Sequence, residues 1–350
     1  MSYLCKKIRE LLSRSTTIEM RVIIDKAIPY IKGILEPYAE VAYCDGREID
    51  AERIKLCDAM IIRTRTHCNR ELLEGSNIRF IATATIGTDH IDEEYCHKAG
   101  ITVARAAGCN ARGVLQWVAA ALRHISLMDN KQPSDYTLGV VGVGNVGRNV
   151  AHYARHWGFR VMECDPPRQM REGGEFYSIA EIAEQCDIIT LHTPLNGDTR
   201  HMVNSELIGR MRPNATIINA SRGAVADNRA VKESGHRYIF DVWEGEPSLD
   251  ADILQSAELA TPHIAGYSKQ GKANATAMVI SQFADFFELP IKGWYPPEVT
   301  PVVPRDIEWQ EMVDSIEQYC PIIAQTEHLK SNPTTFESQR NNYDYREEYF

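Results

Sequence analysis

Residues 138–147 of this 350-residue chain are LGVVGVGNVG, an apolar run that leads directly into the glycine pattern Gly142-Val-Gly144-Asn-Val-Gly147. The run predicts a buried strand over Leu138–Val143, and the residues after the last glycine predict a helix. In such a turn the first glycine makes the tight bend, the second lets the backbone approach a pyrophosphate, and the third lets helix and strand pack closely. The start of the helix offers free N–H groups to an anion. This stretch predicts a dinucleotide-binding domain.

An acidic residue follows the next predicted strand, as this kind of domain requires. Asp165 lies eighteen residues after Gly147, in Glu163-Cys-Asp-Pro-Pro167. Its carboxylate can accept hydrogen bonds from an adenosine ribose and would repel a 2′-phosphate, which favours NAD over NADP. Arg168 weakens that preference. The alternative is a glycine turn without any ligand.

Short apolar strands alternate with helix-length segments along most of the chain, which predicts α/β architecture with two doubly wound parallel sheets. Long helices are expected over Asn110–Met128, with Asn110 as its N-cap, and over Tyr267–Leu289. The strands expected in the first series are Arg21–Asp25, Val41–Tyr43, Ala59–Ile62, Phe80–Thr83 and Ile101–Ala104. Those expected in the second are Leu138–Val143, Arg160–Cys164, Ile188–Leu191, Thr216–Asn219, Arg237–Val242 and Leu259–Ala260.

Composition excludes several classes of function. With 38 Lys and Arg against 48 Asp and Glu, the net charge is −10, which argues against nucleic acid and anionic membranes as partners. No apolar window approaches the length of a transmembrane helix. The nine cysteines are scattered without a C-x-x-C pair, so we expect no metal site and free thiols in a reducing cytoplasm. Residues 1–19 lack the apolar core of a signal peptide; we expect a disordered extension or a misplaced start codon.

Three polar segments follow later strands of the second sheet, and each carries one residue suited to acid–base chemistry. They are Asn219-Ala-Ser-Arg222-Gly223, Asp241-Val-Trp-Glu-Gly-Glu246-Pro247 and Thr261-Pro-His263-Ile-Ala-Gly266-Tyr267. Because the carboxyl ends of parallel strands meet at one sheet edge, we expect Arg222, Glu246 and His263 to converge there.

Such a trio suits oxidation of a 2-hydroxy acid by a nicotinamide cofactor. His263 would take the hydroxyl proton, and Glu246 would orient the imidazole and stabilise its cationic form. Arg222 would hold the substrate carboxylate with its planar fork. Each residue alone is more simply a surface charge, a turn residue or a structural histidine; the three together after a dinucleotide loop favour catalysis.

These motifs resemble those of the NAD-dependent D-2-hydroxyacid dehydrogenases. The resemblance covers about residues 20–350 and is narrower to a branch that oxidises 4-phospho-D-erythronate. The stretches that carry this narrower resemblance are DKAIPYIKGIL (25–35), ATIGTDHID (84–92), DVWEGEP (241–247), TPHIAGY (261–267) and FESQRNNYDYRE (336–347). The resemblance implies the product 2-oxo-3-hydroxy-4-phosphobutanoate, a role in pyridoxal 5′-phosphate synthesis, and a cytoplasmic homodimer. It implies a flavodoxin-like substrate domain (20–105 and 266–289), a Rossmann domain (106–265) and a small C-terminal α+β dimerisation domain (290–350).

The resemblance also implies residue roles. Arg222, Glu246 and His263 would form the active site, with His263 as proton acceptor and donor, and Thr64, Thr85 and Tyr267 would contact substrate. The residues expected to contact NAD are Gly142, Gly144, Asn145, Val146, Gly147, Asp165, Thr193, Ala220, Asp241 and Gly266.

A basic segment, Arg63-Thr64-Arg65-Thr66, follows the strand expected over Ala59–Ile62. If the chain stays extended there, alternation places Arg63 and Arg65 on one side and the two threonines on the other. Either side could hold a phosphate, because guanidinium forks suit the dianion and hydroxyls add hydrogen bonds. The alternative is a solvated basic loop.

Three departures from the family pattern stand out. Nineteen positions separate Arg222 from Asp241, about a helical turn fewer than expected; Ala107 replaces a proline; and the tail is short. Two other functions stay open. One is a dehydrogenase of 3-phosphoglycerate, glyoxylate or hydroxypyruvate, and the other is an NAD-sensing protein that binds partner peptides as a corepressor does.

Overall fold

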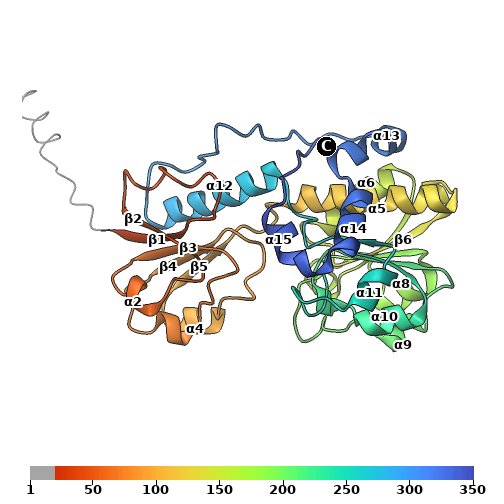
Figure 1. Ribbon diagram of the computed structural model, residues 1–350, viewed down its shortest axis with the longest axis horizontal. Helices are drawn as coiled ribbons and strands as arrows, with labels where there is room; N and C mark the ends of the chain where they lie inside the picture. Colours follow the sequence, from red (N-terminus) through yellow and green to blue (C-terminus); the bar gives the residue numbers. More distant parts are fainter. Residues whose placement is uncertain (1–19) are drawn as a thin grey trace, which may run out of the picture. The chain divides into compact units, whose positions relative to one another are not determined.

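The computed structural model describes residues 20–350, and the expectation for residues 1–19 lies outside this range. The chain forms two compact units (Figure 1). The smaller unit comprises the chain up to Ala107 together with Ala273–Pro296, and the larger unit comprises Gly108–Lys272 together with Pro297–Phe350. The tail therefore belongs to the larger unit, whereas the sequence suggested a third domain beginning at residue 290.

The smaller unit is built on a five-stranded parallel sheet in the order β2-β1-β3-β4-β5. Helix α12 covers one face of this sheet (Figure 1). Phe80 of β4 packs against Phe283 of α12, with ring centroids 5.7 Å apart. Short helices lie on the other side. The elements are β1 (Arg21–Asp25), β2 (Glu40–Cys44), α2 (Ala51–Ile54), β3 (Ala59–Ile62), α3 (Arg70–Leu73), β4 (Phe80–Thr83), α4 (Glu93–Lys98), β5 (Thr102–Arg105) and α12 (Lys269–Phe286).

The larger unit is built on a six-stranded parallel sheet in the order β11-β10-β9-β8-β6-β7. The chain proceeds from β6 to β7 on one side and returns to β8 on the other, so the strand order reverses at β6. Ligands of open α/β sheets bind at such a reversal, beyond the carboxyl ends of the strands. The strands are β6 (Thr137–Val141), β7 (Arg160–Cys164), β8 (Ile188–Leu191), β9 (Thr216–Asn219), β10 (Arg237–Phe240) and β11 (Leu259–Ala260).

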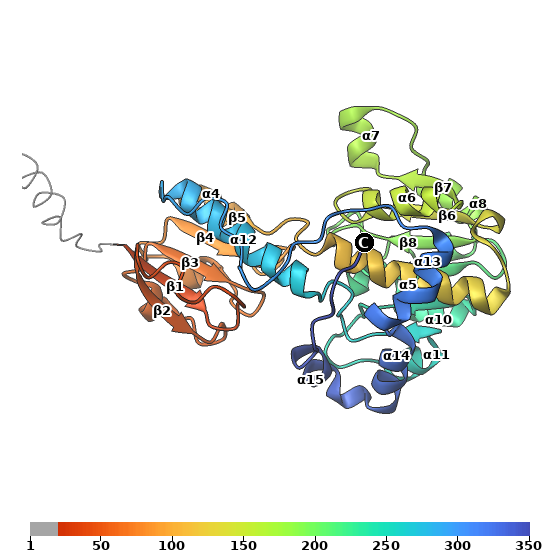
Figure 2. The same ribbon diagram turned by 90° about the horizontal axis from the view of Figure 1, so that it is seen from above.

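Helices cover both faces of this sheet. Figure 1 shows α5 and α6 over one face and α8 to α11 over the other, and Figure 2 shows α7 projecting at the β7 edge. Two separate apolar cores fill the space between helices and sheet. The helices are α5 (Ala111–Asp129), α6 (Gly147–His156), α7 (Pro166–Glu172), α8 (Ile179–Gln185), α9 (Ser205–Ile208), α10 (Asn228–Ser234) and α11 (Ala251–Ser256), with 3-10 turns η1 (Pro133–Asp135) and η2 (Gly223–Val225).

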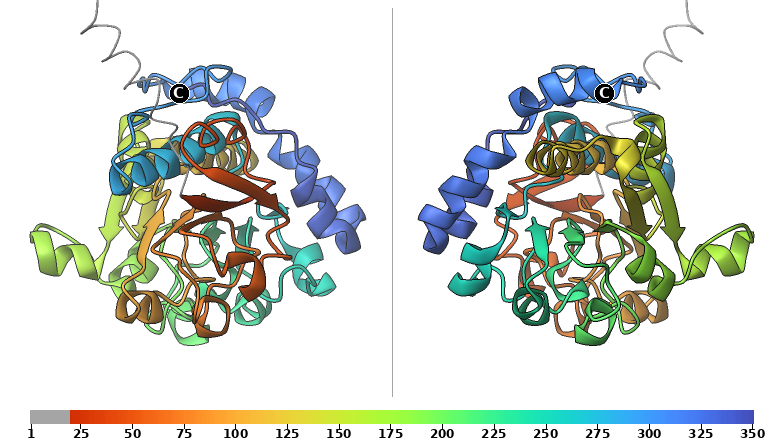
Figure 3. Two further views of the ribbon diagram at one scale, coloured as in Figure 1. Left: turned by 90° about the vertical axis from the view of Figure 1, so that its left-hand side faces the viewer. Right: turned by 90° about the vertical axis from the view of Figure 1, so that its right-hand side faces the viewer.

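The C-terminal tail is helical, so the expectation of an α+β domain is wrong. It contains α13 (Trp309–Tyr319), α14 (Ile322–Ser331), η3 (Pro333–Thr335) and α15 (Phe336–Asn341), and its one strand-like contact is an isolated bridge between Ser268 and Arg346. The tail helices run along the side of the larger unit away from α7 (Figure 3). Met312, Ile316 and Leu329 are fully buried, because α13 and α14 pack their apolar faces on the two apolar cores of the larger unit.

Most expected strands match the structure, and the differences have local causes. The strand expected over Leu138–Val143 ends at Val141, because Gly142 adopts a positive φ of 84° that terminates it. The strand expected over Arg237–Val242 ends at Phe240. Asn110 occupies the N-cap position of α5 as expected, but its side chain caps no N–H and its Oδ1 is buried without a hydrogen-bond partner.

The residues described by the structure contain no helix long and apolar enough to cross a membrane. Within 20–350 there is also no cluster of three or more side chains suited to hold a metal ion. All eight cysteines of this range are buried free thiols.

Candidate active site

The glycine loop at the end of β6 leaves an open space beside its backbone. A Cβ on Gly147 would lie 1.9 Å from the carbonyl oxygen of Gly142, so only glycine permits this approach of helix to turn. A Cβ on Gly144 would meet no atom within 4 Å. No side chain caps the start of α6 after Val146, and its N–H groups therefore face this space. A pyrophosphate fits these features, since it needs close backbone approach and uncapped donors.

Two polar side chains border the loop. Asp165 accepts hydrogen bonds from the backbone N–H of Val143 at 2.8 Å and from that of Arg168 at 2.9 Å, so it adjoins the loop and also caps α7. The Arg168 guanidinium donates to the carbonyl oxygen of Val143 and pairs with Glu172 at 2.7 Å. The positive charge of Arg168, which weakened the preference for NAD over NADP, is therefore neutralised by Glu172.

Thr193 supplies an unused donor beside the same turn. Its Oγ1 is buried and has no hydrogen-bond partner among the described residues, and its Cγ2 would lie 2.9 Å from a Cβ on Gly142. A buried hydroxyl without a partner costs free energy unless a ligand or water satisfies it. Thr193 therefore fits a dinucleotide that enters the loop.

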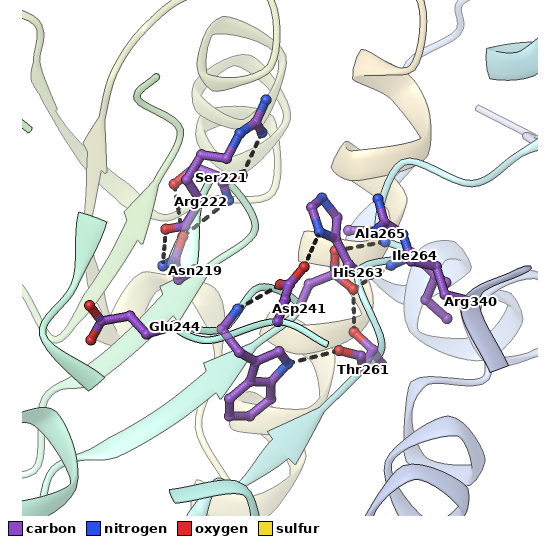
Figure 4. A network of polar contacts seen from close by, with 12 residues as sticks. Asn219, Ser221, Arg222, Asp241, Glu244, Thr261, His263, Ile264, Ala265 and Arg340 are labelled. Carbon is purple, nitrogen blue, oxygen red and sulfur yellow. Dashed lines mark hydrogen bonds and ion pairs between the residues drawn. The ribbon is translucent and has the colours of Figure 1, made fainter. Parts of the chain in front are cut away.

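Asp241, at the end of β10, holds the segment that carries His263. Its backbone carbonyl accepts from the N–H of His263 at 2.8 Å, and its carboxylate accepts from the N–H groups of Ile264 and Ala265 at 2.7 and 2.9 Å (Figure 4). The Thr261 hydroxyl adds a third bond to the carboxylate at 2.6 Å. Burial raises the pKa of the Asp241 carboxyl, and His263 together with these donors offsets only part of that rise. The family resemblance implied that Asp241 contacts NAD, and in the structure its oxygens bond the segment that carries His263.

His263 and Glu246 form a hydrogen-bonded pair. His263 Nδ1 lies 2.8 Å from Glu246 Oε2, and the other carboxylate oxygen accepts from the backbone N–H of Trp243 at 2.8 Å. Burial pushes the pKa of Glu246 upward, but the nearby His263 and the hydrogen bonds outweigh burial and hold this pKa below its usual value. An ionised carboxylate at Nδ1 requires the proton on that nitrogen, which leaves Nε2 as the proton acceptor.

His263 itself has a positive φ of 58°, in the left-handed region that non-glycine residues seldom occupy. Such a conformation costs free energy and persists where surrounding bonds determine it. The three successive N–H groups that donate to Asp241 supply that determination, and they fix the imidazole relative to the sheet.

Arg222 follows β9 in a loop that contacts the Glu246 loop directly. The side chain of Asn219 shapes the turn, accepting from the Ser221 N–H at 3.0 Å and donating to the Arg222 carbonyl at 2.9 Å. A Cβ on Gly223 would lie 2.1 Å from the carbonyl oxygen of Trp243, so glycine allows the two loops to touch. The connection between β9 and β10 is short, but it still contains a capped helix, α10. The Arg222 loop therefore lies between two regular elements, β9 and α10, despite the short connection.

Other expected residues of the larger unit also have defined places. Gly266 packs on the start of α5, because a Cβ there would lie 2.0 Å from the Asn110 Nδ2. Ala220 follows β9 directly, and Asn145 contacts Arg148 at the start of α6. The Tyr267 hydroxyl accepts from Arg340 Nε at 3.2 Å.

The basic segment of the smaller unit differs from its expected geometry. Residues 63–66 form a turn closed by a bond from the Thr66 N–H to the Arg63 carbonyl, so the alternation assumed for an extended chain is wrong. The Arg63 guanidinium pairs with buried Asp25 at 3.0 Å, and the Thr66 hydroxyl donates to Gly46. Thr64 is exposed, and the Arg65 side chain is half-buried. Thr85 bonds Thr83 at 2.6 Å.

Two arginines of the tail adjoin the site, and the sequence did not single them out. Arg340 of α15 contacts Tyr267, and Arg346 is buried with its guanidinium donating to the carbonyls of Ile264, Ala265 and Gly113. The His263 segment is thus bonded through its N–H groups to Asp241 and through its carbonyls to Arg346. Both arginines lie in a polar stretch of sequence, which gives no sign that either side chain is buried. Only the resemblance of this stretch to the family branch drew attention to it.

Comparison with known proteins shows the enzyme family to which the chain is similar. Residues 112–265 match the model of the NAD binding domain of D-isomer specific 2-hydroxyacid dehydrogenases. The 3-phosphoglycerate dehydrogenase of Entamoeba histolytica, solved with NAD, superposes with a TM-score of 0.66 at 27% identity over 77% of this chain and 96% of that one. The D-lactate dehydrogenase of Aquifex aeolicus shares the fold, with a TM-score of 0.62 at 22% identity over 77% of this chain and 95% of that one.

Nearer relatives define the branch. The erythronate-4-phosphate dehydrogenase of Bacteroides thetaiotaomicron is 43% identical over 342 residues, which cover 94% of this chain and 97% of the relative. The enzyme of the same description from Bacteroides fragilis is 42% identical over 345 residues, with the same two shares. The chain therefore belongs to the erythronate-4-phosphate dehydrogenases of the D-isomer specific 2-hydroxyacid dehydrogenase family.

Proposed function

We propose that the protein oxidises 4-phospho-D-erythronate to 2-oxo-3-hydroxy-4-phosphobutanoate, with NAD as the oxidant. The observation that carries the reaction class is the 2.8 Å pair of His263 and Glu246, together with the contact between the loop of Glu246 and the loop of Arg222. The substrate rests on relatives of this description that align over nearly the whole chain.

His263 Nε2 accepts the proton of the C2 hydroxyl, and Glu246 stabilises the imidazolium that forms. Arg222 binds the C1 carboxylate with its guanidinium fork and polarises the C2 oxygen. Bound NAD would supply the acceptor for the hydride of C2. The glycine loop and the start of α6 would hold its pyrophosphate, Asp165 would accept hydrogen bonds from its adenosine ribose, and the Thr193 hydroxyl would add a further hydrogen bond. Ala220, Asp241 and Gly266 would contact it as well.

The experiment is a comparison of NADH formation with 4-phospho-D-erythronate, 3-phosphoglycerate, glycolate and glycerate. In a parallel reaction, a 2-oxo acid serves as alternative electron acceptor, so that tightly bound NADH does not hide turnover. The proposal expects the highest kcat/KM with 4-phospho-D-erythronate and its loss in His263→Ala. A preference for 3-phosphoglycerate would keep the family and reject the substrate. NAD binding without turnover on any of these acids would support the corepressor-like alternative.

Four further assignments belong to this proposal. The chain acts as a homodimer, which light scattering of the purified protein tests. Thr64, Thr85 and Tyr267 contact the substrate. The product serves pyridoxal 5′-phosphate synthesis, so deletion of the gene should create a requirement for pyridoxine. The enzyme works in the cytoplasm, where buried free thiols stay reduced.

A further inference from the structure

The guanidinium of Arg340 has donors that the protein does not use. It makes one hydrogen bond, from Nε to the Tyr267 hydroxyl at 3.2 Å, and among residues 20–350 the structure gives it no ion pair and no other acceptor. The side chain is only half-exposed. A partly buried guanidinium with unpaired Nη donors has lost hydrogen bonds to water and gained none from the protein. A bound anion would supply charge-assisted hydrogen bonds in their place.

Other arginines of the tail are satisfied differently. Arg305 pairs with Glu311 at the surface, and Arg346 donates to backbone carbonyls in the interior. Arg340 therefore differs from both, because its unpaired end is neither neutralised by a carboxylate nor bonded to the backbone.

Two carboxylates lie close enough to Arg340 to interact with its charge, but neither is free to pair with it. Glu246 is bonded to His263 and to the Trp243 N–H. Asp241 is bonded to the Thr261 hydroxyl and to the N–H groups that follow His263. Both acids are thus occupied by other donors, and the Nη groups of Arg340 remain available beside the catalytic pair.

The position of Arg340 relative to the catalytic pair matches the shape of the substrate. Figure 4 shows Arg222 and Arg340 on opposite sides of His263. In 4-phospho-D-erythronate the reacting C2 lies between two anionic groups, the C1 carboxylate and the C4 phosphate. With C2 at His263 and the carboxylate at Arg222, the phosphate end extends toward the other side of the imidazole.

We propose that Arg340 binds the terminal phosphate of the substrate through its Nη donors, with Tyr267 fixing the guanidinium through Nε. This assignment rests on the proposed function and deepens it, since it gives the C-terminal tail a role in substrate choice. It also differs from a phosphate site at residues 63–66, because Arg63 is already paired with Asp25.

The test compares a phosphorylated acid with its unphosphorylated counterpart. Arg340→Gln and Arg340→Lys are assayed with 4-phospho-D-erythronate and with D-erythronate, with NAD saturating. Arg305→Gln is the matched control, because it removes an equal charge from the same tail outside the site. NAD affinity, measured by fluorescence titration, checks that each variant is folded.

Loss of charged hydrogen bonds predicts a fall of kcat/KM for 4-phospho-D-erythronate by about ten- to a hundred-fold in Arg340→Gln, mostly through KM. Turnover of D-erythronate and the pH profile of kcat should stay within about two-fold of the parent enzyme, and Arg340→Lys should recover part of the loss. Arg305→Gln should behave as the parent enzyme does.

An equal loss with both acids would overturn the proposal, because Arg340 would then act through the fold or through Glu246. If D-erythronate reacts too slowly to measure, inorganic phosphate serves as a competitor of the substrate. Its inhibition constant must rise at least about ten-fold in Arg340→Gln, and an unchanged constant overturns the proposal. A parent enzyme with no turnover of 4-phospho-D-erythronate would instead refute the proposed function itself.

Discussion

The substitution Glu246→Gln separates the charge of this carboxylate from its shape. Because the Trp243 N–H donates to Oε1 at 2.8 Å, the new side chain must place its carbonyl oxygen at that position. The amide NH2 then occupies the position of Oε2, 2.8 Å from His263 Nδ1. It can only donate there, so Nδ1 must accept and the imidazole proton moves to Nε2.

An imidazole protonated at Nε2 has no lone pair for the hydroxyl proton of the substrate. A comparable loss of the correct tautomer in other enzymes lowers kcat by up to about 10⁴-fold. We expect a fall of about 10³- to 10⁴-fold in kcat, which corresponds to about 4–5.5 kcal/mol of activation free energy. KM should change little, because Arg222 and its loop remain intact.

The assay measures initial rates of NADH formation together with thermal unfolding. Since the Trp243 and His263 contacts are kept, the melting temperature should stay within a few degrees of the parent protein. Glu258→Gln is the matched control, because Glu258 pairs with His124 at 2.7 Å elsewhere in the larger unit. A kcat within ten-fold of the parent in folded Glu246→Gln would refute the idea that this carboxylate sets the tautomer.

Three other predictions concern the loop, the cofactor and acid stability. Gly147→Ala should destabilise the protein by about 1–3 kcal/mol and abolish NAD binding, because its Cβ would lie 1.9 Å from the Gly142 carbonyl oxygen; urea unfolding and NAD titration measure both effects. Thr193→Val should leave the free protein at least as stable while weakening NAD binding by about three- to ten-fold, because the hydroxyl that it removes is unsatisfied without a ligand. The pKa of Glu246 is lowered on folding, so its contribution to stability is complete above its usual pKa of 4.5 and disappears as the pH falls through the folded-state value. Melting temperatures measured downward from pH 4.5 should therefore fall more steeply for the parent protein than for Glu246→Gln.

Much of the fold could be predicted because its strands are continuous apolar runs. Ala59–Ile62 and Thr216–Asn219 are strands at those bounds. The errors arise where the backbone, rather than hydrophobicity, ends an element: Val143 is apolar and buried, yet the strand stops before Gly142. The tail was wrongly expected to be α+β. Its helices are stabilised by packing on the rest of the larger unit, and the local sequence pattern does not reveal such tertiary contacts.

The candidate site shows the same division. The positions of Arg222, Glu246 and His263 just after parallel strands were enough to expect them near one sheet edge. The hydrogen bonds of Asp241 to the His263 segment could not be foreseen, because a buried carboxylate is recognised only by the donors around it. The two arginines of the tail were missed for a related reason, since a charged residue in a polar stretch normally faces solvent.

The central claim is that a hydride leaves C2 of a 2-hydroxy acid while His263 takes the hydroxyl proton. The most direct measurement uses 4-phospho-D-erythronate deuterated at C2, with mass analysis of the reduced cofactor from a single turnover. The deuterium should appear quantitatively in the reduced nicotinamide, and His263→Ala should form none. Deuterium released to solvent, or transfer that persists in His263→Ala at the parent rate, would contradict the claim.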